Sequence, residues 1–179
     1  MTNHVELRNV TKQFGSQKAV NQVDLVLKAG ESVGMAGHNG AGKSTIMKLI
    51  LGLITPTEGE VMLLGERTGS KAGALLRSQI GYLPETVALH PSLTGIETMD
   101  FYAKLKKQPL SKNRELLERV GISQAARRRV GTYSKGMRQR LALAQALLGE
   151  PKVLLFDEPT TGLDPASRQM FYEVVRELN

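Results

Sequence analysis

Eight consecutive residues constrain the fold of this chain more than any other feature. They read Gly37-His38-Asn39-Gly40-Ala41-Gly42-Lys43-Ser44 and fit the pattern G-x-x-x-x-G-K-[ST]. Glycines let backbone amides turn toward one centre, and a following helix adds the partial positive charge of its N-terminus, so such a loop can hold phosphate oxygens. We expect Lys43 to reach the terminal phosphates, Ser44 to ligate Mg²⁺, and Thr45 to complete the nucleotide-binding set. The alternative is a glycine-rich turn that binds no ligand.

The sequence on either side of the loop argues against that alternative. Residues 31–36 read as a buried strand that runs into the loop, and residues 43–53 read as a helix that begins at its end. Strand, glycine loop and helix in this order form the context in which the pattern binds phosphate. The spacing of the glycines alone would only suggest it.

The rest of the chain predicts an α/β fold built around a mostly parallel sheet. Residues 5–11 and 19–27 alternate in polarity and predict a pair of antiparallel strands near the N-terminus. Short strands are expected at residues 61–64, 80–83 and 153–156, and helices at residues 94–107, 111–120, 134–148 and from Asp164-Pro165 onward. We expect one domain over residues 1–179, with a nucleotide-binding core at 1–84 and 150–179 and a helical subdomain at about 85–149.

Two carboxylates follow the apolar run at residues 153–156. A parallel strand delivers the residues after its carboxyl end to the sheet edge where α/β folds bind ligands. Asp157 can hold Mg²⁺ through water, and Glu158 can polarise the water that attacks a γ-phosphate. A chance acidic pair at a strand end is the other interpretation, and the upstream phosphate loop makes it less favourable.

Ser134 precedes a helical pattern that runs through Lys135, Gly136 and Met137. A helix N-terminus is a second device for binding phosphate, because its first amides lack carbonyl partners. Taken alone, this feature favours an ordinary serine cap.

Composition excludes several other classes of function. The chain has no Cys and three scattered His, so disulfides, thiolate catalysis and a transition-metal site are not expected. No apolar run approaches the roughly 20 residues that cross a bilayer. The net charge of +7 suits phosphate ligands, an anionic membrane or nucleic acid. The run Arg127-Arg128-Arg129 favours a solvated helix end over a nucleic-acid patch, because 4% aromatic content leaves few stacking residues.

The motifs together resemble those of ABC ATPase domains, in the same order and over essentially the whole chain. The matching segments are the loop at 37–44, the helix start at Ser134, the pair Asp157-Glu158 and the segment that ends at Asp164. The resemblance implies an ATP-hydrolysing domain that works as a homodimer with ATP and Mg²⁺ at the interface. It also implies an integral membrane permease as partner, a place at the cytoplasmic face of the inner membrane, and no direct nucleic-acid partner.

The same resemblance assigns roles to further residues. Ser134, Lys135, Gly136 and Met137 match the signature motif, which caps the ATP held by the other subunit. Asp164 matches an aspartate at the dimer interface, and Phe14 matches the aromatic that stacks on adenine. Glu85, after Gly81-Tyr82-Leu83-Pro84, matches the γ-phosphate sensor, which is a catalytic group and a ligand of Mg²⁺.

The chain departs from the family pattern at these positions. Glu85 stands where Gln is usual and adds negative charge near the γ-phosphate, which makes Mg²⁺ more necessary. Lys135 replaces a glycine and Met137 a glutamine, so Ser134 and the backbone would carry the capping. Phe14 lacks the hydroxyl of the usual tyrosine but keeps the ring, unless it is a core residue beside the first turn.

The family's switch histidine follows a strand that lies beyond the last helix expected here, and His4, His38 and His90 all precede that helix. The resemblance therefore implies a chain that is shortened at its C-terminus and lacks the final strands of the sheet. This leaves open a module that binds nucleotide without turnover, and an ATPase that acts on nucleic acid or the ribosome.

A closer resemblance links the chain to the ATPase subunits of copper-associated transporters that serve nitrous oxide reductase maturation. It is carried by residues 37–39, 81–85, 133–141 and 144–151. With no Cys and no clustered His, such a subunit would supply energy and would not bind the metal cargo itself.

Overall fold

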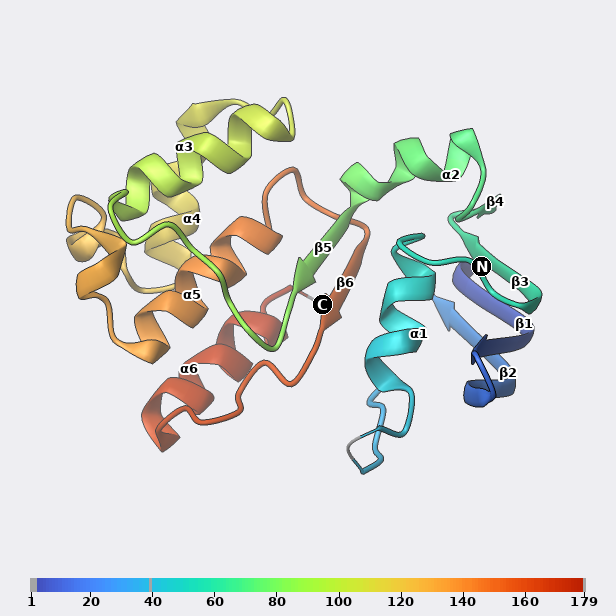
Figure 1. Ribbon diagram of the computed structural model, residues 1–179. Helices are drawn as coiled ribbons and strands as arrows, with labels where there is room; N and C mark the ends of the chain where they lie inside the picture. The colour runs from blue at the N-terminus through green and yellow to red at the C-terminus, as the bar shows by residue number, and fades with distance from the viewer. Residues whose placement is uncertain (1–2, 39, 179) are drawn as a thin grey trace. The chain divides into compact units, whose positions relative to one another are not determined.

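The computed structural model describes residues 3–38 and 40–178 (Figure 1). The chain forms two units, Met1–Ile80 and Gly81–Asn179, and each is described by itself. The predicted core at 1–84 and 150–179 combines parts of both units and remains a prediction.

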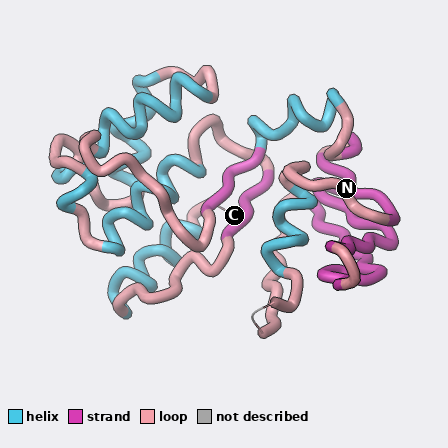
Figure 2. The backbone as a smooth tube through the Cα atoms, viewed as in Figure 1, coloured by secondary structure: helices cyan, strands magenta, loops and turns pink. Residues whose placement is uncertain are grey.

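The first unit is built on an antiparallel sheet with the order β2-β1-β3-β4 (Figure 2). Its strands are β1 (Asn3–Phe14), β2 (Gln17–Lys28), β3 (Glu58–Leu63) and β4 (Glu66–Arg67). The predicted pair of N-terminal strands is confirmed, and both strands run further than expected, to a turn at Gly15 and Ser16. In the register, Leu7 pairs with Leu25 on one side and with Val61 on the other.

One face of this sheet carries the core of the first unit. Val5 and Leu7 alternate with half-buried or exposed neighbours along β1, as a strand with one buried face requires. Helix α1 (Lys43–Ile50) packs against β2 and β3 and buries Met47, Leu49 and Ile50. A second helix, α2 (Lys71–Leu76), lies against β3 and β4 and continues into the 3₁₀ turn η1 (Arg77–Gln79).

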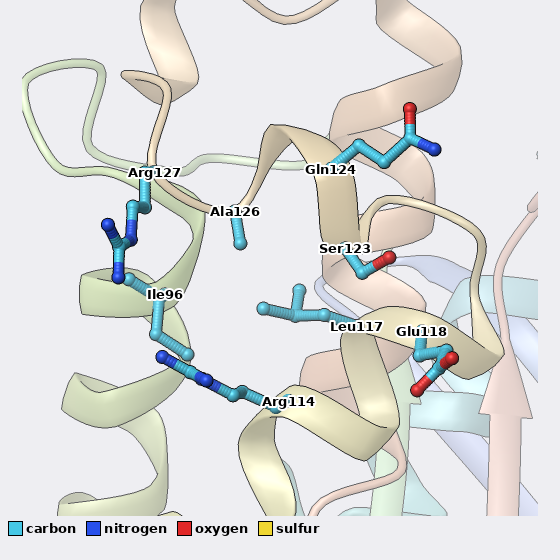
Figure 3. Close-up of a pocket in the computed structure, with 8 residues that line it drawn as sticks. All are labelled: Ile96, Arg114, Leu117, Glu118, Ser123, Gln124, Ala126 and Arg127. Carbon is cyan, nitrogen blue, oxygen red and sulfur yellow. The ribbon is translucent and has the colours of Figure 1, made fainter.

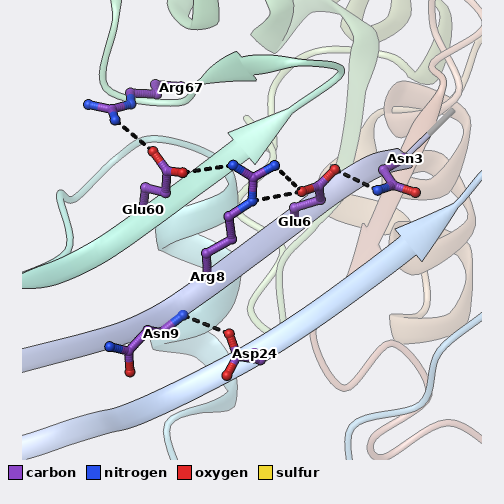
Figure 4. Close-up of polar contacts among 7 residues, drawn as sticks. All are labelled: Asn3, Glu6, Arg8, Asn9, Asp24, Glu60 and Arg67. Carbon is purple, nitrogen blue, oxygen red and sulfur yellow. Dashed lines mark hydrogen bonds and ion pairs between the residues drawn. The ribbon is translucent and has the colours of Figure 1, made fainter.

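The solvent side of the sheet holds a chain of polar contacts (Figure 4). Arg8 donates to Glu6 at 2.6 Å and to Glu60 at 2.9 Å, and Arg67 meets Glu60 at 2.7 Å. Hydrogen bonds from Asn3 and then from Arg8 lower the pKa of Glu6, and the hydrogen bond from Arg8 is the main cause of the lowered pKa of Glu60. Charge therefore joins β1, β3 and β4 across their exposed faces.

The predicted strand at residues 31–36 is wrong. Residues 31–38 have no regular secondary structure, and all but the half-buried Met35 are exposed. Val33, one of the apolar residues that suggested a buried strand, is 52% exposed. A strand requires a neighbour that pairs with its backbone, and this segment does not join the described sheet of the first unit.

The second unit consists of four helices and a two-stranded sheet, with β5 (Ile80–Leu83) hydrogen-bonded to β6 (Val153–Phe156). The helices are α3 (Gly95–Leu105), α4 (Asn113–Arg119), α5 (Lys135–Ala146) and α6 (Pro165–Arg176). The 3₁₀ turns η2 (Leu110–Lys112), η3 (Ser123–Ala125) and η4 (Val130–Thr132) connect α3, α4 and α5. Each predicted helix and strand of this unit is present, with ends that differ by a few residues.

The core of the second unit gathers around α5. Leu141 and Leu143 are fully buried, and they belong to a cluster that includes Met99 of α3, Leu117 of α4 and Phe171 of α6. Within residues 3–38 and 40–178, no helix is long and apolar enough to cross a membrane.

Candidate nucleotide-binding site

The glycine loop of the first unit closes around the side chain of Lys43. The Lys43 ammonium donates to the carbonyl of Gly37 and, at 3.3 Å, to that of His38. The amide of Ala41 donates to the His38 carbonyl at 3.1 Å, which tightens the turn. The side chain that we expect to meet phosphate thus lies over the loop backbone. Asn39, another predicted contact, lies outside the described residues.

Helix α1 begins at this loop without a side-chain cap. Its N-cap is Gly42, whose carbonyl accepts from the amide of Ile46 at 2.9 Å. The amides of Lys43, Ser44 and Thr45 lie in the first turn, where no carbonyl of the same helix can reach them. In contrast, Thr94, Ser134 and Asp164 cap α3, α5 and α6 with their side chains. The α1 N-terminus therefore presents amides and a positive partial charge to an anion.

Gly42 also fixes the loop to the sheet. A Cβ atom at this position would lie 2.3 Å from the carbonyl oxygen of Ala19 on β2. Only glycine allows this approach together with the φ of 87° that starts the helix. The predicted phosphate loop is thus held against the hairpin formed by β1 and β2.

Phe14 lies at the end of that hairpin, where it pairs with Gln17 of β2. The side chain is 51% exposed, so the alternative of a core phenylalanine is wrong. The Lys12 ammonium lies 5.0 Å from the ring centroid, within cation–π range. Gln17 is two residues from Ala19, so the ring is near the strand segment that holds the loop. Its stacking on adenine remains a prediction.

In the second unit, Asp157 and Glu158 follow β6 as expected. The Asp157 amide donates to the carbonyl of Leu83 at 2.9 Å, which extends the pairing of β5 with β6. The Asp157 side chain is buried, with 6% exposure, and its carboxylate accepts no hydrogen bond from the described residues. Tyr82 lies on β5, and burial and then the Asp157 charge raise the pKa of its hydroxyl.

Glu158 has an uncommon backbone conformation, with φ of 47°. Non-glycine residues pay about 1 kcal/mol or more for this region and often do so at functional sites. The turn that follows holds the residue: Thr161 donates to the Glu158 carbonyl at 3.1 Å and to its Oε2 at 3.2 Å. The turn thus directs the carboxylate independently of the strand.

Glu85 emerges at the same end of the sheet as Asp157 and Glu158. The arrows of β5 and β6 point the same way in Figure 1, and Glu85 follows Leu83 by two residues. Its side chain is exposed. The structure therefore places all three predicted acidic residues after the carboxyl ends of paired strands.

The predicted signature residues open α5. The Ser134 hydroxyl accepts from the Met137 amide at 3.2 Å, so it acts as an ordinary N-cap in this structure. Gly136 is buried, and a Cβ atom there would lie 2.7 Å from Oγ of Ser167. The Lys135 side chain extends over Gly162, where a Cβ atom would lie against its ammonium. Ser134 and Lys135 are themselves exposed.

Asp164 caps α6 and is tied to the same neighbourhood. Its carboxylate accepts from the Ser167 amide at 2.9 Å and from the Ser167 hydroxyl at 2.7 Å. The side-chain hydrogen bond is the largest cause of the lowered pKa of Asp164. Sequence reasoning did not identify Ser167, nor the buried Gln139, whose side-chain amide donates to the Pro159 carbonyl at 2.8 Å. A polar residue amid the apolar positions of α5 was the available signal for Gln139.

The predicted site residues thus fall into two groups. The glycine loop and Phe14 lie in the first unit, and the acidic residues, the α5 N-terminus and Asp164 lie in the second. An uncapped helix after a glycine loop, and a buried aspartate followed by glutamate at a strand end, define a P-loop nucleotide-binding protein.

The chain belongs to the ABC transporter family, whose model matches residues 20–161. It is 40% identical over 178 residues to the ABC transporter ATP-binding protein YxlF of Bacillus subtilis, covering 97% of this chain and 58% of that protein. It is 37% identical to the bacitracin transport ATP-binding protein BcrA of Bacillus licheniformis, covering 100% of this chain and 60% of the relative.

Among solved structures, the dimeric structure of MJ0796, a bacterial ABC transporter cassette, matches with a TM-score of 0.87 and 29% identity. The match covers 97% of this chain and 82% of that chain. The fold is therefore that of a P-loop ABC ATPase, with an antiparallel N-terminal sheet and a helical portion, as predicted. The chain spans 58% to 60% of the length of the two curated relatives above.

Proposed function

We propose that this chain binds ATP and hydrolyses it to drive a transporter. The observation that carries the proposal is the start of α1, where Lys43 and uncapped amides face a glycine loop. That arrangement suits the triphosphate of a nucleotide, because several donors converge on anionic oxygens. Family membership supports ATP as the nucleotide and transport as the use of its energy.

The residues of each unit suit different parts of the reaction. Lys43 neutralises charge on the terminal phosphates, and the α1 amides hold phosphate oxygens in place. Glu158 accepts hydrogen-bond donation from the attacking water and polarises it. Glu85, at the same sheet end, senses the γ-phosphate. Phe14 offers an exposed ring for stacking on the base.

The donor atoms present fit a magnesium ion. Ser44 supplies a hydroxyl, and Asp157 and Glu85 supply carboxylates, which are the hard oxygen ligands that Mg²⁺ prefers. The buried Asp157 carboxylate, with no hydrogen bond from the described residues, is the observation that supports this fit. Across residues 3–38 and 40–178 no cluster of three acidic or His side chains could hold a metal alone, so phosphate oxygens and water would complete the shell. Bound there, Mg²⁺ neutralises phosphate charge.

A pair of matched variants tests the hydrolytic role of Glu158. Glu158→Gln keeps the shape of the side chain but removes its charge, so we expect unchanged Mg-ATP affinity and a turnover rate lower by about 100-fold or more. Glu85→Gln restores the residue usual in the family and should retain turnover. Affinity is measured by calorimetry and turnover by phosphate release. Parent-rate hydrolysis by Glu158→Gln would assign the role to another group.

The same measurements separate turnover from binding alone. A module that only binds nucleotide would show ATP affinity that depends on Lys43, and no phosphate release above that of Glu158→Gln. The matching solved structure is dimeric, which supports a homodimer in which Ser134, Lys135, Gly136 and Met137 face the partner's ATP. A membrane permease completes the transporter, and its docking would place the chain at the cytoplasmic face of the membrane.

The finer assignment is to copper-linked maturation of nitrous oxide reductase. Its support is the resemblance at residues 37–39, 81–85, 133–141 and 144–151. The relative named for bacitracin transport supports antibiotic export as the competing assignment. Deleting the gene separates the two: loss of nitrous oxide reduction that copper does not restore supports the first, and bacitracin sensitivity with normal nitrous oxide reduction refutes it.

A further inference from the structure

A cavity of about 450 Å³ lies among α3, α4 and η3 of the second unit, away from every site residue named above (Figure 3). Its floor is apolar and consists of Ile96, the fully buried Leu117 and Ala126. Its charged side chains are Arg114, Arg127 and Glu118, with Ser123 and Gln124 beside them. This size falls within the range of small-molecule sites, about 300 to 1,000 Å³.

The two arginines enter the cavity from different elements. Arg114 is on α4 and Arg127 follows η3, and Figure 3 shows both side chains extending toward Ile96. Glu118 lies on the other side of Leu117, close to Ser123. The cavity thus has two guanidinium groups at one end, an apolar middle and a carboxylate at the other end.

Neither guanidinium has an acidic partner within the part of the chain that the structure describes. Arg114 and Glu118 are four residues apart on α4, a spacing at which opposite charges commonly pair. They form no ion pair, and Arg114 extends toward Ile96 instead. The cavity end therefore holds two positive charges that no described carboxylate neutralises.

The neighbours of Arg127 show that its position is distinctive. Arg128 donates to the carbonyl of Thr132 at 3.4 Å, and Arg129 forms a backbone bridge with Thr94 while its charge contributes to the lowered pKa of Glu97. Of the three consecutive arginines, Arg127 is the one that lines the cavity. The run is thus divided among separate contacts, which its sequence did not reveal.

We infer that this cavity binds a phosphate monoester that carries an apolar group. Two guanidinium forks on different elements suit a phosphate dianion, since each can donate a pair of parallel hydrogen bonds. Ile96, Leu117 and Ala126 suit the apolar body and favour it by removing its surface from water. The chemistry is shared by a free alkyl phosphate and by the head group of phosphatidate in a membrane. This inference does not depend on ATP hydrolysis.

Methyl NMR of the protein labelled at Ile, Leu and Ala tests the inference with hexyl phosphate as the probe. The Ile96 methyl should shift on titration, and hexanol or inorganic phosphate alone should bind at least about tenfold more weakly. The Ile46 methyl of α1 reports binding at the glycine loop, so occupation of that site is recognised separately. Phosphate release is measured in parallel and should not depend on the cavity variants.

Three variants define the role of the charges. Arg114→Gln and Arg127→Gln should each weaken hexyl phosphate binding by about tenfold, because each removes one charged fork. Arg128→Gln is the matched control, with the same loss of charge one residue outside the cavity, and should leave affinity unchanged. Equal affinity for hexanol and hexyl phosphate, an unmoved Ile96 methyl, or an equal loss in Arg128→Gln would overturn the inference.

Vesicles distinguish the two sources of the phosphate. Phosphatidylcholine vesicles with and without phosphatidate are sedimented with the parent protein and the same variants. Phosphatidate-dependent binding that requires Arg114 and Arg127, but not Arg128, identifies a membrane lipid as the ligand. If hexyl phosphate binds as predicted and vesicle binding does not require these arginines, the ligand is a free phosphate ester.

Discussion

Replacing Gly42 by Ala tests whether the phosphate loop is fixed to the β1–β2 hairpin. The added Cβ would lie 2.3 Å from the Ala19 carbonyl oxygen, at least about 0.7 Å closer than real contacts of this kind. Because both atoms belong to rigid backbone, the loop or β2 must move, at a cost of about 1 to 3 kcal/mol. The positive φ of 87° adds about 1 to 2 kcal/mol for any L side chain. We therefore expect a loss of about 2 to 5 kcal/mol.

Gly40 provides the control within the same loop. Its φ is also 87°, but a Cβ atom there would meet nothing within 4 Å. Gly40→Ala should thus cost only the backbone term, about 1 to 2 kcal/mol. The free energy of unfolding in urea, followed by methyl signals of Leu7 and Leu63, measures both variants in the first unit. Equal losses for the two variants would refute the anchoring of the loop on Ala19.

Two further predictions concern charge in the first unit. Lys43→Ala should weaken ATP binding by about tenfold or more in calorimetry while leaving the urea midpoint unchanged, because it removes a cation but no packed group; an unchanged dissociation constant would contradict the assignment of the loop. Hydrogen bonds lower the pKa of Glu6 and Glu60, so their stabilisation is present above the unfolded-state pKa of about 4.3 and is lost as pH falls through the lower folded pKa. Urea midpoints between about pH 2 and 6 should therefore fall less steeply in Arg8→Met than in the parent, and equal slopes would contradict this.

Local patterns were sufficient to predict most of the second unit. The apolar spacing along α5 and the short apolar run of β6 correspond directly to buried faces, because both elements pack around one core. Capping residues set the helix starts, since Ser134 and Asp164 accept from amides three residues later. At these positions the chemistry of neighbouring residues determines the structure.

Where distant contacts decide the structure, the sequence was a poorer guide. Val33 and Met35 have the alternation of a strand, but residues 31–38 pair with no neighbour in the described sheet. Helix α2 was not predicted. Its Gly73 is unfavourable in a helix, yet it is buried, and a Cβ atom there would lie 2.0 Å from the Arg67 carbonyl oxygen. Close packing on β4 therefore outweighs the low helix propensity of glycine.

The contacts of α5 show how a signature helix and a hydrolytic loop can act on one another within the second unit. Gln139 donates to the Pro159 carbonyl one residue after Glu158, and the Lys135 side chain lies over Gly162 in the same turn. Gly136 lies so close to Ser167 that a larger residue would displace the start of α6. These three α5 residues contact the segment that follows β6 at three separate points. A phosphate bound at the α5 N-terminus would therefore act on the same packed segment that sets the conformation of Glu158.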